Sequence, residues 1–154
     1  MQKKIFNRGF SLIELLIVIA IIAFLAALSA PSFFKFLAKS KRSEAYITLR
    51  SLYMAEKAYW MEQGSYTNKM SGQGSLGWKP EGTLQYTYGF PGSDGVHCAI
   101  GSLKAPSSTL SPAKATGNEF IIVAAADIDG DGTYDLLTIN QNGVITLVTD
   151  DLAE

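Results

Sequence analysis

The longest hydrophobic stretch of this chain lies near its N-terminus. Residues 15–28 form an unbroken apolar run, and residues 10–28 carry one charged side chain, Glu14. As a helix rising about 1.5 Å per residue, residues 10–28 would be about 28 Å long, close to the thickness of the bilayer interior. An ionised carboxylate is costly in such a segment and persists there only with a partner or a function. The pattern therefore predicts a membrane-length helix in which Glu14 has a specific role.

The next segment changes from uniformly apolar to amphipathic. Residues 32–63 are rich in helix formers and contain no glycine or proline, and Gly64 is a plausible residue to end the helix. At about 100° per residue, one apolar stripe is expected to face a globular part of the chain, with Glu56 inside it. The stripe consists of Ala45, Leu49, Leu52 and Tyr59, flanked by Tyr46, Tyr53 and Trp60. Ile47, Met54 and Met61 lie on the opposite face, where they would contact either neighbouring subunits or loops of the same chain.

The C-terminal half has the alternating pattern of strands. Residues 65–83 are polar and glycine-rich, and residues 91–117 contain three prolines, so both are predicted to be loops. Strands are predicted at residues 83–90, 119–126, 134–140 and 144–149, and Asn142-Gly143 predicts a tight hairpin between the last two. The expected fold class is α+β, with a long N-terminal helix packed on a four-stranded, mainly antiparallel sheet.

Composition narrows the function classes. The chain has 154 residues and a net charge of −1, which excludes a highly charged disordered chain and a basic nucleic-acid binder, and no direct nucleic-acid site is evident. Cys98 is the single cysteine, so no intramolecular disulfide forms, and we assign this predicted loop thiol no role. With one histidine and no phosphate-binding loop, metalloprotease helix or nucleophile elbow, the chain is expected not to be an enzyme.

Three interpretations fit the N-terminal segment: a cleaved secretory signal, a plain membrane anchor and a specialised processed segment. Lys3, Lys4 and Arg8 would hold the N-terminus in the cytoplasm, so that the residues after about 28 are translocated. Signal-peptidase sites are poor, because cleavage after Ala30 would place Pro31 directly beyond the cut. The secretory signal also leaves Glu14 unexplained.

Residues 9–14, with the sequence Gly-Phe-Ser-Leu-Ile-Glu, resemble the processing site of type IV pilins and the related pseudopilins of type II secretion. The basic leader and the aliphatic run that follows complete the pattern, and the resemblance covers about residues 1–67. It implies that a prepilin peptidase cleaves after Gly9 and that the new N-terminus, Phe10, is N-methylated. It also implies that Glu14 meets the amine of a neighbouring Phe10 in a fibre, and that Pro31 loosens or kinks the helix. The alternative at Pro31 is an ordinary helix end.

The resemblance also implies a domain organisation and a set of partners. Residues 1–9 would be a leader peptide, 10–31 a transmembrane and filament-core helix, 32–64 its amphipathic half, and 65–154 a globular β headgroup. The chain would rest in the inner membrane with its N-terminus in the cytoplasm and its headgroup in the periplasm. A pilus assembly platform would then polymerise it into a homo-oligomeric helical filament on the cell surface, used for adhesion, motility or DNA uptake. No cofactor is required.

Two other functions remain open at this point. One is the major pseudopilin of a type II secretion system, which would assemble through the same kind of apolar N-terminal helix. The other is a membrane-anchored calcium-binding module that never polymerises, which leaves the pattern of Gly9, Phe10 and Glu14 unexplained.

An acidic segment between the second and third predicted strands suggests a Ca²⁺ site. Asp127, Asp129, Asp131 and Asp135 occupy positions 1, 3, 5 and 9 of an EF-hand-type loop, and Thr133 could offer its carbonyl at position 7. Position 12 is a threonine rather than the usual bidentate glutamate, so another oxygen would have to complete the site. A solvated hairpin turn is the alternative.

Overall fold

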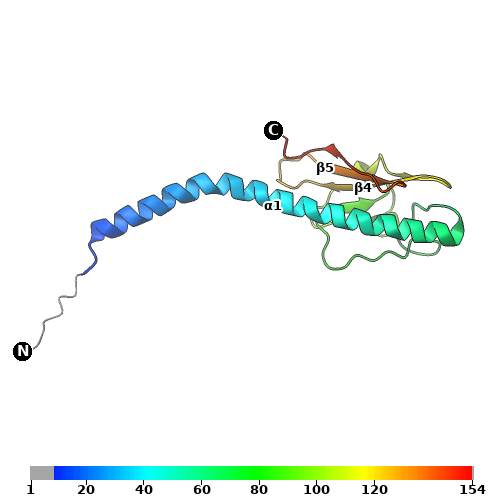
Figure 1. Cartoon of the computed structure of the whole chain (residues 1–154), viewed down its shortest axis with the longest axis horizontal. Coiled ribbons are helices and arrows are strands. Elements are labelled where there is room, and N and C mark those ends of the chain that lie inside the picture. The colour runs from blue at the N-terminus through cyan, green and yellow to red at the C-terminus, as the bar shows by residue number, and fades with distance from the viewer. Residues whose placement is uncertain (1–8, 154) are drawn as a thin grey trace, which may run out of the picture. The chain divides into compact units, whose positions relative to one another are not determined.

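The computed structural model describes residues 9–153, apart from the side chain of Pro31. One long helix, α1 (Leu12–Gln63), is followed by six strands and a short 3-10 helix, η1 (Ser107–Leu110). The chain divides into two compact units at the boundary between Phe36 and Leu37. Figure 1 shows the C-terminal half of α1 beside the strands of the second unit.

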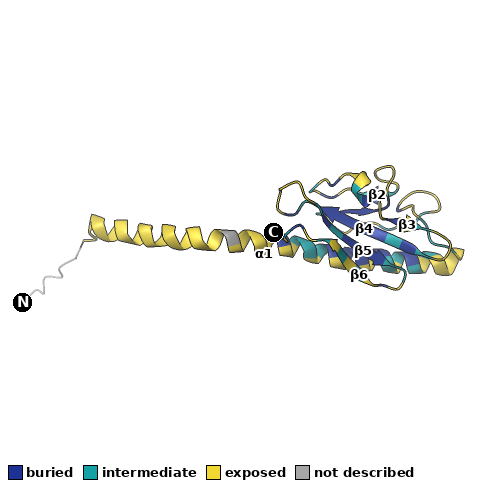
Figure 2. Ribbon diagram, turned by 90° about the horizontal axis from the view of Figure 1, so that it is seen from above, coloured by how far each residue is buried: buried dark blue, intermediate teal, exposed yellow. Residues whose placement is uncertain are grey.

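The first unit consists of the N-terminal half of α1. Every side chain described from Phe10 to Phe36 is exposed, as the yellow helix in Figure 2 shows. A window of this helix has a mean hydropathy of 2.9 with none of its residues buried, and among the described residues it is the one helix long and apolar enough to cross a membrane. α1 continues through position 31, which excludes the alternative of a helix end there. The predicted kink at Pro31 stays a prediction.

The C-terminal end of α1 is set by a glycine, as the sequence predicted. Gly64 adopts a φ of 71°, and its N–H donates to the carbonyl of Trp60 at 2.8 Å. This left-handed conformation carries little penalty for glycine and satisfies one of the last helical carbonyls.

The second unit contains an antiparallel sheet with the order β2-β1-β4-β5-β6, and β3 pairs separately with β4. The strands are β1 (Thr87–Gly89), β2 (Cys98–Ala99), β3 (Lys114–Ala115), β4 (Phe120–Ala126), β5 (Asp135–Asn140) and β6 (Ile145–Thr149). The predicted hairpin turn joins β5 to β6, with Gly143 at φ 73° and its N–H bonded to the Asn140 carbonyl at 2.9 Å. Six strands rather than four make up this α+β fold, so the predicted strand count was wrong.

The two additional strands lie in the segment predicted to be a loop. β2 and β3 have two residues each, too few to show an alternating pattern among prolines and glycines. The predicted strand at 83–90 is also shorter in the structure, because only Thr87–Gly89 forms ladder pairs.

One face of α1 contributes to the hydrophobic core of the second unit. Ala45, Leu49 and Leu52 are fully buried in the same cluster as the side chains of the central strands β4 and β5. Tyr53 packs against Phe120 of β4 with ring centroids 6.2 Å apart. The centre of the predicted apolar stripe therefore faces the sheet, and its burial helps to dock this part of α1. The flanking Tyr46 and Trp60 are 41% and 43% exposed, so the stripe is narrower than predicted.

Candidate assembly and cation-binding sites

The residues of the processing pattern lie at the start of α1. Gly9 and Phe10 precede the helix, and the Phe10 side chain is 78% exposed. The Glu14 Oε2 accepts a hydrogen bond from the Ser11 N–H at 2.8 Å, one half of the arrangement called a capping box. The bond between residues 9 and 10 is thus exposed and non-helical, as cleavage requires, while Glu14 caps its own helix. Residues 1–8 of the leader lie outside the described residues.

A second exposed apolar surface lies on the later half of α1. Ile47, Met54 and Met61 are 72%, 66% and 79% exposed, so loops of the same chain do not cover them. Large apolar side chains in a row on one helix face are typical of an interaction surface. Of the two alternatives for this face, contact with neighbouring subunits is the one that the exposure favours.

The acidic segment forms the loop between β4 and β5. Both oxygens of Asp127 accept backbone N–H groups, from Gly130 at 2.6 Å and from Gly132 at 3.0 Å, while Asp131 accepts the Thr133 N–H at 2.6 Å. Gly130 and Gly132 have φ values of 91° and 94°, which favour glycine. These turns draw the carboxylates of the loop together.

The structure adds a residue that the sequence did not indicate. Asp151 follows β6, and one of its carboxylate oxygens lies within 4.8 Å of an oxygen from each of Asp127, Asp129 and Asp131. Its Oδ2 accepts the Ile128 N–H at 2.8 Å. Burial raises the pKa of Asp151 against that hydrogen bond, and the three neighbouring carboxylates raise it further. No sequence signal marks Asp151, because the other three acids precede the β5–β6 hairpin in the sequence and Asp151 follows it.

Asp135 is not part of this group. It is fully buried at the start of β5, where Arg42 binds both its oxygens and the Tyr86 hydroxyl donates to Oδ2 at 2.7 Å. The structure brings together three of the predicted ligand side chains and uses the fourth in an ion pair between α1 and the sheet. For Thr133, the bond recorded is the one that its N–H donates to Asp131.

Glu56 is the residue of the buried stripe that the sequence did not explain. It is fully buried, its Oε2 accepts the Thr67 N–H at 3.3 Å, and its Oε1 has no hydrogen-bond partner within the part of the chain that the structure describes. Burial raises the pKa of Glu56 to about 7, although the Thr67 hydrogen bond opposes the shift. At neutral pH this carboxyl group is therefore only partly ionised.

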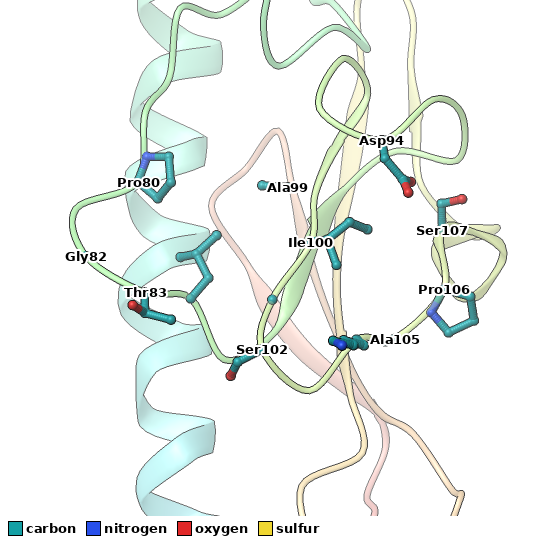
Figure 3. A pocket seen from close by; sticks show the side chains of 13 residues that line it. Pro80, Gly82, Thr83, Asp94, Ala99, Ile100, Ser102, Ala105, Pro106 and Ser107 are labelled. Carbon is teal, nitrogen blue, oxygen red and sulfur yellow. The ribbon is translucent and has the colours of Figure 1, made fainter.

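A surface pocket and the thiol of Cys98 are the remaining features that could be considered for a catalytic role. The pocket in Figure 3 lies between the segments around Pro80 and Pro106, and its charged lining residues among those described are Asp94 and Lys104. Cys98 is buried in β2, and its thiol donates to Asp94 at 3.4 Å. Burial, followed by the contact with Asp94, raises the pKa of Cys98 to about 11, so the thiol stays protonated and unreactive at neutral pH.

Comparison with known proteins agrees with the architecture. Residues 6–30 match the family model described as the prokaryotic N-terminal methylation motif. The chain is 40% identical over 111 residues to the type IV major pilin protein PilA of Myxococcus xanthus, covering 72% of this chain and 46% of that protein. It is 39% identical over 74 residues to the type IV wide pilus major component PilA4 of Thermus thermophilus, covering 47% and 55%.

A third relative is the type IV major pilin protein PilE1 of Neisseria gonorrhoeae, 34% identical over 68 residues that cover 44% of this chain and 41% of that protein. The chain spans about half the length, or less, of these curated relatives. All three are pilus proteins, which does not favour the secretion pseudopilin. The methylation motif, these relatives, and a long N-terminal helix packed on an antiparallel sheet agree with one another, and the chain belongs to the type IV pilin family.

Proposed function

We propose that this chain is the structural, non-enzymatic subunit of a type IV pilus. The observation that carries the proposal is the sequence of residues 9–14 at the head of a helix whose apolar half is exposed throughout. A helix of this kind is unstable in water and needs either lipid or copies of itself. Its hydropathy and length suit a bilayer before assembly and a bundle of helices afterwards.

The proposed sequence of events begins in the inner membrane. The basic leader keeps the N-terminus in the cytoplasm, and the headgroup lies in the periplasm. A prepilin peptidase cleaves after Gly9, and an N-methyltransferase modifies the amine of Phe10. A membrane assembly platform then stacks the subunits into a homo-oligomeric helical filament that reaches the cell surface.

Within the filament, the amine of Phe10 and the carboxylate of Glu14 on neighbouring subunits form an ion pair. Two opposite charges in an apolar core stabilise the assembly only when they are close together. The pair therefore fixes the axial register of each helix. The exposed face of Ile47, Met54 and Met61 adds apolar contacts farther along α1. Adhesion, motility and DNA uptake are the uses that we propose for such a fibre.

The test is a deletion strain complemented with the wild-type gene or with variants. Filaments are sheared from the cells, and the subunit is analysed by intact-mass and N-terminal mass spectrometry. We expect filaments that require the gene and a subunit that begins with methylated Phe10. Adhesion, twitching and transformation assays on the same strains identify which use depends on the fibre.

A variant pair sharpens this test. Gly9→Leu places a bulky side chain at the cleavage site and is expected to retain the leader and form no filaments. Asn7→Leu introduces the same leucine side chain two residues before the cleavage site and is expected to be processed normally. A mature terminus other than Phe10, or normal filaments assembled from uncleaved Gly9→Leu subunits, contradicts the proposal.

A further inference from the structure

The β4–β5 loop and the segment after β6 bring four acidic side chains together, apart from the residues of the proposed filament contacts. Asp127, Asp129 and Asp131 come from the loop, and Asp151 comes from beyond the last strand, with one oxygen of each lying within 4.8 Å of the others. We propose that these four carboxylates bind one Ca²⁺ ion, which ties the loop to the C-terminal segment of the headgroup.

The state of Asp151 is the observation that points to a ligand. Asp151 is 3% exposed, and its Oδ1 has no hydrogen-bond partner among the described residues. A buried polar atom without a partner is costly, and native structures rarely keep one without a reason. The Ile128 N–H holds Oδ2 at 2.8 Å and so fixes the carboxylate in place. A cation between the four side chains would give Oδ1 its missing partner.

The charges of the four carboxylates also favour a bound cation. Ionised carboxylates within 4.8 Å of one another repel, and of these four Asp129 and Asp131 are exposed while Asp127 is half-buried. Lys41 bonds to a residue of this loop, but its ammonium donates to the Ile128 carbonyl at 2.8 Å rather than to a carboxylate. Arg42 is committed to Asp135 and Asp150. Among the described residues, no salt bridge to these four carboxylates is recorded.

The geometry suits a large, hard ion. Ca²⁺ binds carboxylate and carbonyl oxygens at about 2.3 to 2.6 Å, so two oxygens on opposite sides of it lie about 5 Å apart. Oxygens within 4.8 Å of one another can all reach such an ion with small side-chain movements. A set of four carboxylates without nitrogen or sulfur excludes the softer metals as preferred occupants. Mg²⁺ prefers to retain several of its waters, which this crowded group of side chains disfavours.

Asp151 also takes the place of the ligand that the linear motif lacks. Position 12 of the motif is Thr138, which lies inside β5 and pairs with Val123 and Thr146. A ligand from beyond β6 closes the site from another part of the chain. Binding therefore stabilises the folded headgroup, since the unfolded chain does not hold Asp151 near the loop.

The experiment uses the full chain in detergent micelles, first stripped with a chelator and then titrated with CaCl₂ by calorimetry. Thermal unfolding is followed by circular dichroism with and without Ca²⁺. The variants are Asp129→Asn, which is exposed, and Asp151→Asn, which keeps an oxygen for the Ile128 N–H. Glu81→Gln, an exposed acid outside the site, controls for the loss of one charge. MgCl₂ is titrated in parallel.

We expect one Ca²⁺ per chain and a higher melting temperature for the wild type and Glu81→Gln. Each site variant should bind at least about tenfold more weakly, because affinity follows the number of charged ligands. Three results overturn the proposal: no heat at millimolar Ca²⁺, equal binding by an Asp129→Asn/Asp151→Asn double variant, or equal affinity for Mg²⁺. Because the readout needs no filaments, failure here is distinct from failure of the proposed pilus function.

Discussion

Arg42 of α1 holds both carboxylate oxygens of Asp135 at the start of β5. Its Nε lies 2.9 Å from Oδ2 and its Nη2 lies 2.6 Å from Oδ1. The Tyr86 hydroxyl and the Asp151 N–H complete the coordination of this fully buried carboxylate. Burial disfavours the charge on Arg42, but its bonds to Asp150 and Asp135 outweigh that effect and raise its pKa. The pair therefore joins the helix to the sheet through a bidentate, charge-assisted contact.

Removing one partner of this pair is expected to be severely destabilising. Arg42→Gln leaves Asp135 buried without a counter-charge, a change that typically costs about 3 to 5 kcal/mol of unfolding free energy. Thermal unfolding of the full chain in detergent, followed by circular dichroism, measures the effect. Lys79→Gln removes an exposed positive charge and is the matched control, expected to stay within about 0.5 kcal/mol of wild type. Equal melting temperatures for Arg42→Gln and Lys79→Gln would show that the pair contributes little.

The buried carboxyl group of Glu56 is expected to make the folded state less stable as the pH rises from about 4.5 to 7. The pKa of its carboxyl group rises from 4.5 to about 7 on folding, so the folded state binds this proton more tightly than the unfolded state does. Below pH 4.5 ionisation carries no penalty; the penalty grows between pH 4.5 and 7 and is complete above 7. We expect Glu56→Gln to be more stable than wild type by roughly 2 to 3 kcal/mol above about pH 7.5.

The measurement is the difference in melting temperature between Glu56→Gln and wild type across this pH range. The difference should shrink towards zero as the pH falls to about 4.5, because both side chains are then neutral. Glu62→Gln, at an exposed position near the end of the same helix, should show no such trend. A difference that does not vary with pH would contradict a raised pKa.

The sequence was sufficient for the parts of the fold that rest on local signals. The apolar run and the helix formers of residues 32–63 predicted α1, and Gly64 and Asn142-Gly143 predicted its end and the last hairpin. Each of these is decided by a few neighbouring residues, through helix periodicity or the left-handed backbone that glycine permits.

The different roles of the acidic residues could not be predicted from such local signals. Asp127 and Asp135 look equivalent in the motif. They differ because distant groups bind only Asp135, above all Arg42, which is 93 positions away. Asp151 joins the loop only after β5 and β6 have folded back as a hairpin. Long-range pairing of this kind leaves no periodic trace, and neither do strands of two residues such as β2.

Met54 provides a test of the exposed face of α1. It is 66% exposed, so Met54→Glu should leave the stability of the monomer within about 0.5 kcal/mol of wild type. If this face packs against a neighbouring subunit, a buried unpaired charge there should greatly reduce the number or length of filaments. Electron microscopy of sheared filaments measures this reduction. Gln73→Glu adds the same charge in an exposed loop and should assemble normally; full-length filaments from Met54→Glu would remove this face from the interface.

Glu14 has two separable contributions, a helix cap within its own chain and a charge offered to a neighbour. Its Oε2 accepts the Ser11 N–H at 2.8 Å, a bond that Glu14→Gln keeps and Glu14→Ala loses. If the charge pair with Phe10 sets the register, both variants should be inserted and cleaved after Gly9 but form few filaments. Mass spectrometry of the membrane-bound subunit measures processing, and electron microscopy counts the filaments. If Glu14→Gln assembled normally while Glu14→Ala failed, the cap rather than the charge would be what assembly requires, because the two variants differ in the cap and share the loss of charge.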